Sequence, residues 1–222
     1  MPELKLENVS YRYKNSDRFA LSGVSCAFEG GGLSTVVGPS GSGKTTLLSV
    51  MAGLDRPTGG NVLVNGEDLA AMDQDRYRRE QASMIFQAFQ LFPLLTALEN
   101  VRYPMELNGV PTAEADARAR ELLNGMGIAA EKHRRFPANL SGGEQQRVAI
   151  ARSLASGARI LLADEPTGNL DGENRRNIVD ILKGLAHDSG YCVVIVTHDP
   201  AVAEASDRVW RMSDGVLTEQ AV

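Results

Sequence analysis

Cysteine is scarce in this sequence: the chain of 222 residues contains only Cys26 and Cys192, which lie far apart. Two distant thiols do not make a disulfide framework, so we expect a protein of a reducing compartment. Cys192 lies within an apolar run, where a thiol usually packs as a small hydrophobic group. No apolar run has the length of a membrane span, and the first residues lack the basic and then apolar order of a signal peptide. We therefore expect a cytoplasmic chain whose role at a membrane depends on a partner.

A surplus of basic residues is also absent. The net charge is -5 and the pI is about 5.3, which argues against nucleic acid as the main partner. The short basic clusters at residues 76–79 and 132–135 are interpreted as solvated faces. Hydrophobic residues make up 43% of the chain, enough for a sizeable core. The length allows one large domain, or one domain with an inserted lobe.

A glycine-rich stretch at residues 38–45 has the pattern G-x-x-x-x-G-K-T of a phosphate-binding loop. Its glycines permit backbone conformations that a Cβ would obstruct, so that successive N–H groups face one anion. Lys44 supplies a positive charge for the β and γ phosphates, and the Thr45 hydroxyl is placed to ligate Mg²⁺. A plain turn is the alternative, but eight matched positions between a predicted strand and a predicted helix favour the nucleotide site. The predicted phosphate-binding residues are Gly38, Pro39, Ser40, Gly41, Ser42, Gly43, Lys44, Thr45 and Thr46.

Strand patterns and helix signals occupy different parts of the chain. Alternating or short apolar runs predict strands at residues 4–10, 20–28, 33–37, 61–64, 83–86, 160–163 and 193–196. Helix signals dominate residues 87–155, where Thr96 and Ser141 each precede a glutamate by three positions. Another helix is predicted to begin near Pro111 and to end at Gly125 and Gly127. We interpret this section as a helical lobe inserted into an α/β core.

Three predicted strands deliver polar residues to the same edge of a sheet. The runs 160–163 and 193–196 are continuously apolar, which is typical of strands covered on both faces. Ligands of open α/β sheets bind beyond the carboxyl ends of the strands. Asp164 is thus predicted to hold Mg²⁺ through water, and Glu165 to orient or deprotonate the attacking water. His198 is predicted to contact the γ-phosphate or the water. A turn-capping acidic pair and a structural histidine are the alternatives.

Other candidate residues leave more than one interpretation open. The Gln87 amide could reach the metal or the water, or could simply be a surface side chain. Tyr11 and Tyr13 could stack on a base or serve packing. Ser141, Gly142 and Gly143 resemble a second anion site at a helix start. Two such helix starts in one chain indicate either two phosphates in one pocket or a site shared between two chains.

Residues 140–147, with the sequence LSGGEQQR, resemble the signature motif of ABC-transporter ATPases. The resemblance covers the whole chain and makes residues 160–165 the Walker B strand, Gln87 the Q-loop and His198 the switch histidine. It favours Tyr13 as the adenine-stacking residue. The implied D-loop is Asn169, Leu170 and Asp171, and the implied signature residues are Leu140, Ser141, Gly142, Gly143 and Glu144.

The resemblance also implies a fold. It is an α/β fold with a P-loop NTPase (RecA-like) core, an N-terminal antiparallel β subdomain and an inserted α-helical subdomain. The chain is then a single ABC ATPase domain, 1–222. Residues 1–86 and 156–222 form the catalytic core with the β subdomain, and residues 87–155 form the helical lobe that carries the signature.

Within the superfamily, residues 86–101 and 163–171 resemble one bacterial branch. That branch serves macrolide-type exporters, lipoprotein-releasing complexes and antimicrobial-peptide exporters. Gly31-Gly32 and Gln90 depart from its usual residues without touching the chemistry. The resemblance implies ATP and Mg²⁺ as cofactors, with Thr45, Asp164 and Gln87 at the metal. It also implies a head-to-tail dimer in which loop 38–46 of one chain faces Ser141 to Glu144 of its twin.

The expected function is that of an ATP-hydrolysing subunit coupled to a separate integral-membrane permease, on the inner face of the cell membrane. Residues 87–101 are expected to dock that permease. Phe89, Phe92, Leu94 and Leu95 are either part of this interface or part of the core of the lobe. The expected substrate is a lipoprotein, a macrolide or a peptide-like molecule. A signalling or structural ABC module without transport, a nucleic-acid-associated ABC ATPase and a P-loop kinase are the alternative functions.

Overall fold

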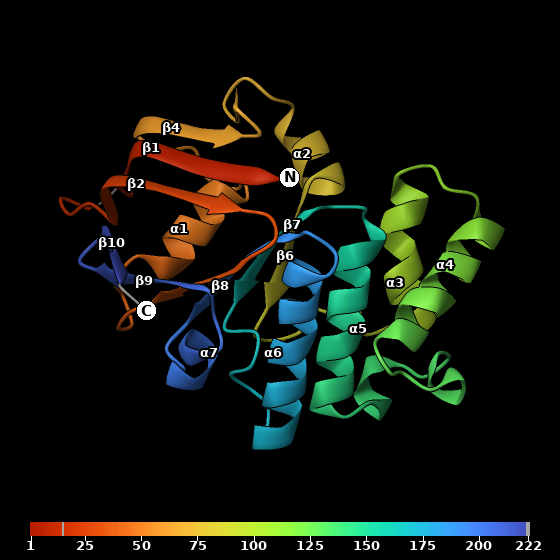
Figure 1. Cartoon of the computed structure of the whole chain (residues 1–222). Helices are drawn as coiled ribbons and strands as arrows, with labels where there is room; N and C mark the ends of the chain where they lie inside the picture. Colours follow the sequence, from red (N-terminus) through yellow and green to blue (C-terminus); the bar gives the residue numbers. More distant parts are fainter. Residues whose placement is uncertain (15, 221–222) are drawn as a thin grey trace.

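The computed structural model describes residues 1–14 and 16–220. Two sheets and seven α-helices make up this part of the chain (Figure 1). The first sheet is antiparallel and has the strand order β2-β1-β4-β5. The second sheet has the order β10-β9-β3-β8-β7-β6, in which only β10 runs antiparallel to its neighbour. Its parallel strands bring the carboxyl ends of β3, β6, β7 and β8 to one edge.

The bounds of the elements follow the predicted strands closely. The strands are β1 Glu3–Tyr11, β2 Leu21–Glu29, β3 Leu33–Val37, β4 Gly59–Val64, β5 Glu67–Asp68, β6 Ala82–Phe86, β7 Ile160–Asp164, β8 Cys192–Thr197, β9 Arg208–Ser213 and β10 Val216–Gln220. The helices are α1 Lys44–Met51, α2 Gln74–Glu80, α3 Ala97–Leu107, α4 Thr112–Gly125, α5 Gly142–Ala155, α6 Gly172–His187 and α7 Pro200–Glu204. The strand and helix patterns of the sequence do not predict α2, α6, α7, β5, β9 or β10.

The large sheet is covered on both faces, which explains its continuous apolar runs. In β8, Cys192, Val194 and Val196 pack in the core that α1 shares with the small sheet. The intervening Val193 and Ile195 pack on the other face, in the core that contains α6. Successive strand residues point to opposite faces, so both sets of positions must be apolar. Figure 1 shows α1 between the two sheets, and α6 and α7 on the far side of the large one.

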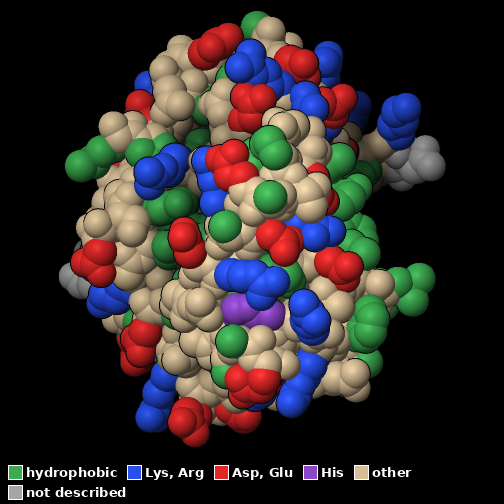
Figure 2. Space-filling view, turned by 90° about the vertical axis from the view of Figure 1, so that its right-hand side faces the viewer, with side chains coloured by type: hydrophobic (Ala, Val, Ile, Leu, Met, Phe, Trp, Pro, Cys, Tyr) green, Lys and Arg blue, Asp and Glu red, His purple; other side chains and the backbone are tan. Residues whose placement is uncertain are grey.

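Helices α3, α4 and α5 form a third core at one side of the molecule (Figure 1). Both predicted capping boxes are present: Thr96 pairs with Glu99 at the start of α3, and Ser141 with Glu144 at the start of α5. Each box satisfies N–H groups that the first turn of a helix leaves without partners. The outer face of these helices carries side chains of both charges, closely intermingled (Figure 2). We infer that this face is solvated.

Asn100 ties the irregular segment 91–96 to α3. Its side chain is fully buried, and its Oδ1 accepts a hydrogen bond from the Phe92 N–H at 2.8 Å. Its Nδ2 lies 2.9 Å from the Leu95 carbonyl oxygen and 3.0 Å from that of Thr96. These bonds hold the backbone of the segment while Phe92 and Leu94 remain exposed at its surface, at 43% and 87%.

We predict that Asn100→Ala lowers the free energy of unfolding by about 1–3 kcal/mol, because it leaves the partly buried Phe92 N–H and Leu95 carbonyl without their partner. Urea denaturation followed by circular dichroism measures this. Asn108→Ala is the matched control, since the Asn108 side chain makes one exposed bond, to the Arg79 carbonyl. Its effect should stay within about 0.5 kcal/mol. Equal losses in the two variants would contradict the anchoring role of Asn100.

Candidate functional site

The parallel strands bring the predicted site residues together at one edge of the large sheet. In register, Val37 of β3 lies opposite Thr197 of β8, and Asp164 of β7 lies opposite Val196. The residues that follow these strands surround a pocket of about 730 Å³. Its lining comprises Tyr13, Ala20, Ser40, Gly41, Gly43, Lys44, Thr45, Thr46, Gln87, Asp164, Glu165 and His198. The edge predicted from sequence therefore exists as one cavity.

The phosphate-binding loop connects β3 to α1, whose first residue is Lys44. The Lys44 ammonium donates hydrogen bonds to the carbonyl oxygens of Gly38 and Pro39, both at 2.9 Å. Gly43 has φ of 110°, and a Cβ at this position would lie 2.3 Å from the Ala20 carbonyl oxygen. The loop thus needs glycine here. Gly38, Pro39 and Ser42 support the loop without lining the pocket themselves.

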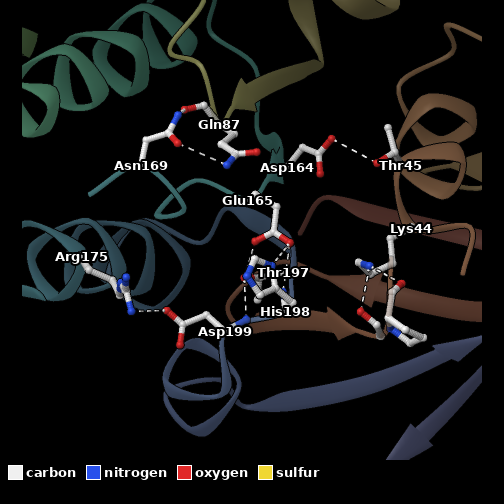
Figure 3. A network of polar contacts seen from close by, with 12 residues as sticks. Lys44, Thr45, Gln87, Asp164, Glu165, Asn169, Arg175, Thr197, His198 and Asp199 are labelled. Atoms are coloured by element: carbon white, nitrogen blue, oxygen red, sulfur yellow. Dashed lines mark hydrogen bonds and ion pairs between the residues drawn. The ribbon is translucent and has the colours of Figure 1, made fainter. Parts of the chain in front are cut away.

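Thr45 and Asp164 both line the pocket and face each other (Figure 3). The Thr45 hydroxyl donates to Asp164 Oδ2 at 3.4 Å. Burial raises the pKa of Asp164, and the charge of Glu165 adds to the rise, while the Thr45 hydrogen bond opposes it. A buried carboxylate with this environment favours a nearby cation. Within residues 1–14 and 16–220, no three His, Cys, Asp or Glu side chains form a ready-made metal site. The Thr45 hydroxyl and the Asp164 carboxylate are hard oxygen donors, and this donor set fits Mg²⁺, which also takes oxygens of substrate phosphates.

Glu165 turns its carboxylate toward the end of β8 (Figure 3). The Thr197 hydroxyl donates to Oε2 at 2.8 Å, and the His198 backbone N–H donates to Oε1 at 3.1 Å. The Nδ1 atom of His198 lies 2.6 Å from Oε1, so it carries the proton in this contact. The side chain of Glu165 is 16% exposed and that of His198 is 74% exposed. One partner is thus held in the wall of the pocket and the other extends into it.

Gln87, which lines the pocket, contacts Asn169. The Gln87 amide nitrogen lies 3.4 Å from Asn169 Oδ1, and Asn169 Nδ2 donates to the Gln87 carbonyl oxygen at 2.9 Å. Leu170 is buried, and Asp171 caps α6 by accepting from the Asn174 N–H at 2.9 Å. The predicted Q-loop and D-loop are therefore neighbours.

The two tyrosines at the end of β1 occupy different environments. Tyr13 lines the pocket, is 50% exposed, and its hydroxyl lies 2.9 Å from Thr46 Oγ1. Tyr11 packs edge-on against the Tyr13 ring, with 5.0 Å between centroids, and its hydroxyl donates to Asp55 at 3.2 Å. Of the two interpretations left open by the sequence, packing describes Tyr11. An open ring face beside the phosphate loop suits Tyr13 for stacking.

The signature residues lie outside the pocket of their own chain. Ser141 caps α5, and Leu140 and Gly143 are buried. Glu144 is partly buried, which opposes ionisation, but Lys132 and the Ser141 N–H hold the pKa of Glu144 below its usual value. None of these residues lines the cavity at the sheet edge. Of the apolar residues nearby, Phe89 packs against the α6 core.

A family model described as ABC transporter matches residues 21–168. The chain belongs to the ABC transporter family. It is 41% identical to Rv0986, an ABC transporter ATP-binding protein of Mycobacterium tuberculosis, over 97% of this chain and 89% of the relative. It is 42% identical to the probable export ATP-binding/permease protein MacB of Pseudomonas entomophila, over 98% of this chain and 33% of that protein.

The fold of this ABC transporter ATPase is that of solved cassettes. The dimeric post-hydrolysis structure of the ATP-binding cassette MJ0796 with ADP and Pi superposes with a TM-score of 0.89 and 38% identity, covering 98% of this chain and 97% of the other. The predicted fold class, with its β and helical subdomains, is confirmed. The chain is an ATPase whose activity is coupled to transport. Within the part that the structure describes, no helix has both the length and the apolar character of a membrane span.

Three residues near the site are not predicted from the sequence as functional: Thr197, Asp199 and Arg175. Thr197 bonds Glu165, and Asp199 forms an ion pair with Arg175 at 3.1 Å. Thr197 and Asp199 flank His198 at the carboxyl end of a buried strand. This position next to a predicted site residue is the feature of the sequence that could have identified them. Arg175 lies inside α6, which the sequence patterns do not predict, so no local pattern identifies it as a site residue.

We predict that Gly43→Ala weakens ATP binding at least tenfold, because the new Cβ would meet the Ala20 carbonyl oxygen and φ lies in the left-handed region. Titration with a fluorescent ATP analogue measures the affinity. Gly125→Ala is the control, since that glycine lies in α4 with open space around it. It should bind ATP with unchanged affinity. Normal affinity in the Gly43 variant would show that the loop tolerates a side chain there.

Proposed function

We propose that this chain is the ATP-hydrolysing subunit of a bacterial export or extraction system with a separate membrane permease. The observation that carries the proposal is the single pocket shared by the phosphate loop, Asp164, Glu165 and His198. A kinase would need an acceptor site, and its chain would have no use for the signature residues. The MacB relatives support the export class, since their names join ATP-binding and permease parts in one protein, of which this chain spans about a third.

The proposed chemistry assigns one task to each side chain. The N–H groups of residues 40–46 and the Lys44 ammonium bind the phosphates of ATP, which releases Lys44 from its carbonyl partners. Thr45, Asp164 through water, and Gln87 would hold Mg²⁺, which supplies neutralisation of phosphate charge. Glu165 accepts the proton of the attacking water at its carboxylate. His198 contacts the γ-phosphate, and Tyr13 stacks on the adenine.

A second copy of the chain completes the proposed site. Ser141, Gly142 and Glu144 lie at a helix start outside their own pocket. The capping box occupies the N–H groups of Ser141 and Glu144, so the N–H groups of Gly142 and Gly143 are the ones proposed to face an anion. Loop 38–46 of one copy then faces these residues of its twin, in a head-to-tail dimer that encloses two ATP molecules. The dimeric MJ0796 cassette, solved with ADP and Pi, supports this arrangement. ATP closes the dimer and hydrolysis opens it.

The segment 87–101 is the proposed contact with the permease, which holds the chain at the inner face of the cell membrane. Phe92 and Leu94 are exposed on this segment, although both are large and apolar. Exposed apolar side chains beside a well-anchored backbone are typical of a protein interface. In this proposal residues 1–86 and 156–222 form the catalytic part, and the lobe 87–155 moves with the permease. A lipoprotein, macrolide or peptide-like molecule is the proposed substrate class.

We predict that Glu165→Gln retains ATP binding, lowers the ATPase kcat by about 10²–10⁴-fold through loss of the general base, and accumulates as an ATP-bound dimer. Phosphate release and light scattering during gel filtration with ATP measure these effects. Glu173→Gln is the matched control, because Glu173 is exposed in the first turn of α6. It should behave as the parent chain. Parental turnover in Glu165→Gln would refute the assignment of the base.

We predict that Leu94→Asp abolishes association with the membrane fraction, because it places a charge in the proposed apolar contact. The ATPase activity of the isolated chain should remain within about twofold, since Leu94 is 87% exposed and lies outside the nucleotide pocket. Sedimentation of membranes followed by detection of the chain is the measurement. Leu54→Asp is the control, an exposed leucine outside residues 87–101. Equal loss from membranes in both variants would contradict a docking role for segment 87–101.

A further inference from the structure

Thr197 is the last residue of β8 and contacts Glu165 directly. We infer that Thr197 is a positioning residue: its hydroxyl holds Oε2 of Glu165, so that Oε1 is presented to the attacking water. This inference rests on the proposed role of Glu165 as the base. Thr197 itself does not line the pocket, so it acts through the carboxylate and is not a catalytic residue.

The direction of the hydrogen bond is determined by the neighbours of the Thr197 hydroxyl. The Asp199 N–H lies 3.0 Å from Thr197 Oγ1, and an N–H can only donate. Oγ1 therefore accepts from Asp199, and its single proton is available for Glu165 Oε2 at 2.8 Å. An ionised carboxylate can only accept, so each group in the series from the Asp199 N–H through the Thr197 hydroxyl to Glu165 Oε2 has a matching partner. Hydrogen bonds to a charged acceptor are also stronger than neutral ones.

The two partners of Glu165 differ in how firmly they are held. The Thr197 residue is fully buried, in a strand paired on both sides, whereas the His198 side chain is 74% exposed. A β-branched side chain in a strand also has a restricted χ1. Oε2 is thus fixed to the rigid sheet. Oε1 accepts from the His198 backbone N–H and from the His198 imidazole, and only the imidazole can turn away toward phosphate. Figure 3 shows both contacts at the same carboxylate.

The turn after Thr197 is fixed from a third element. The Asp199 carboxylate accepts from the Ala201 N–H at 3.0 Å and pairs with Arg175 of α6 at 3.1 Å. The Asp199 N–H is thereby held against the Thr197 hydroxyl, which keeps the donor direction toward Glu165. We infer that this series of contacts determines the rotation of the carboxylate. Displacing a catalytic base by about 1 Å can lower the rate of the reaction on the order of 10²-fold, so the orientation of the Glu165 carboxylate affects the rate of hydrolysis.

The test compares Thr197→Val with Thr197→Ser. Valine keeps the shape of the side chain but removes the hydroxyl, so the ATPase kcat should fall on the order of tenfold. This fall is smaller than the rate enhancement of about 10²–10⁴-fold that a general base contributes, because the base is displaced and not removed. The KM for ATP should stay within about twofold, because phosphate contacts are unchanged. Serine restores the donor and should return kcat to within about threefold of the parent. A rise in KM with unchanged kcat, or no rescue by serine, would overturn the inference.

Two controls separate positioning from loss of structure. Thr35→Val makes the same change at another fully buried strand threonine, whose hydroxyl bonds Ser206 at 2.5 Å. If it lowers kcat as much as Thr197→Val, the inference is wrong. Nucleotide titration and circular dichroism verify that each variant is folded. Should Thr197→Val be unfolded, Thr197→Ala, which adds no bulk, takes its place with the same expected values.

A double-mutant cycle distinguishes failure of this inference from failure of the proposed function. In the Glu165→Gln background, Thr197→Val should change the residual single-turnover rate by less than about twofold, because residues acting as a unit are not additive. A further tenfold loss in that background would mean that Thr197 acts elsewhere. If Glu165→Gln alone hydrolyses ATP at the parental rate, the base assignment fails first, and Thr197 has no base to position.

Discussion

The parallel register of β3, β8 and β7 is the constraint on which the site depends. Thr197 lies opposite Val37, and Asp164 lies opposite Val196, so the residues that follow the three strands meet at one edge. A slip of one residue would exchange the two faces of a strand, because side chains alternate. In β8 it would move Cys192, Val194 and Val196 from the α1 core to the α6 face. The packing of the two cores thus determines which side chains reach the nucleotide pocket.

The charged side chains of the pocket, Lys44 and Asp164, are in environments that favour binding of a ligand with opposite charges. The Lys44 ammonium is bonded to two carbonyl oxygens. Carbonyl groups stabilise the ammonium without cancelling its charge, which remains available to an anion. Across the pocket, burial raises the pKa of Asp164, which would be relieved by a cation. The carbonyl-bonded ammonium and the raised carboxyl pKa are both expected of a site that binds a magnesium nucleotide. Neither can be predicted from the amino-acid composition.

The elements that could be predicted from the sequence are those marked by a local pattern of residues. The continuous apolar runs of β7 and β8, the caps Thr96 and Ser141, and the G-x-x-x-x-G-K-T loop each carry their own signal. The C-terminal strands β9 and β10 were not predicted. In β9, arginines are interspersed among the buried residues, so the strand lacks the continuous apolar run of β7 and β8. It is the last parallel strand on its side of the sheet, next to β3. Helix α6 was missed although Asp171 caps it. Contacts such as Thr197 with Glu165 join residues 32 positions apart, and only the sheet brings them together.

The backbone of Glu165 shows how the sheet sustains a residue that local preference disfavours. Its φ is 47°, in the left-handed region, which costs a non-glycine residue on the order of 1 kcal/mol or more. The Glu165 N–H donates to the Val196 carbonyl oxygen at 2.8 Å, and Thr197 and His198 bind the carboxylate. Glycine would accept this backbone without strain but would offer no carboxylate to these partners. This backbone conformation places the carboxylate at the end of β7, where it reaches Thr197 and His198 and lines the pocket together with the phosphate loop.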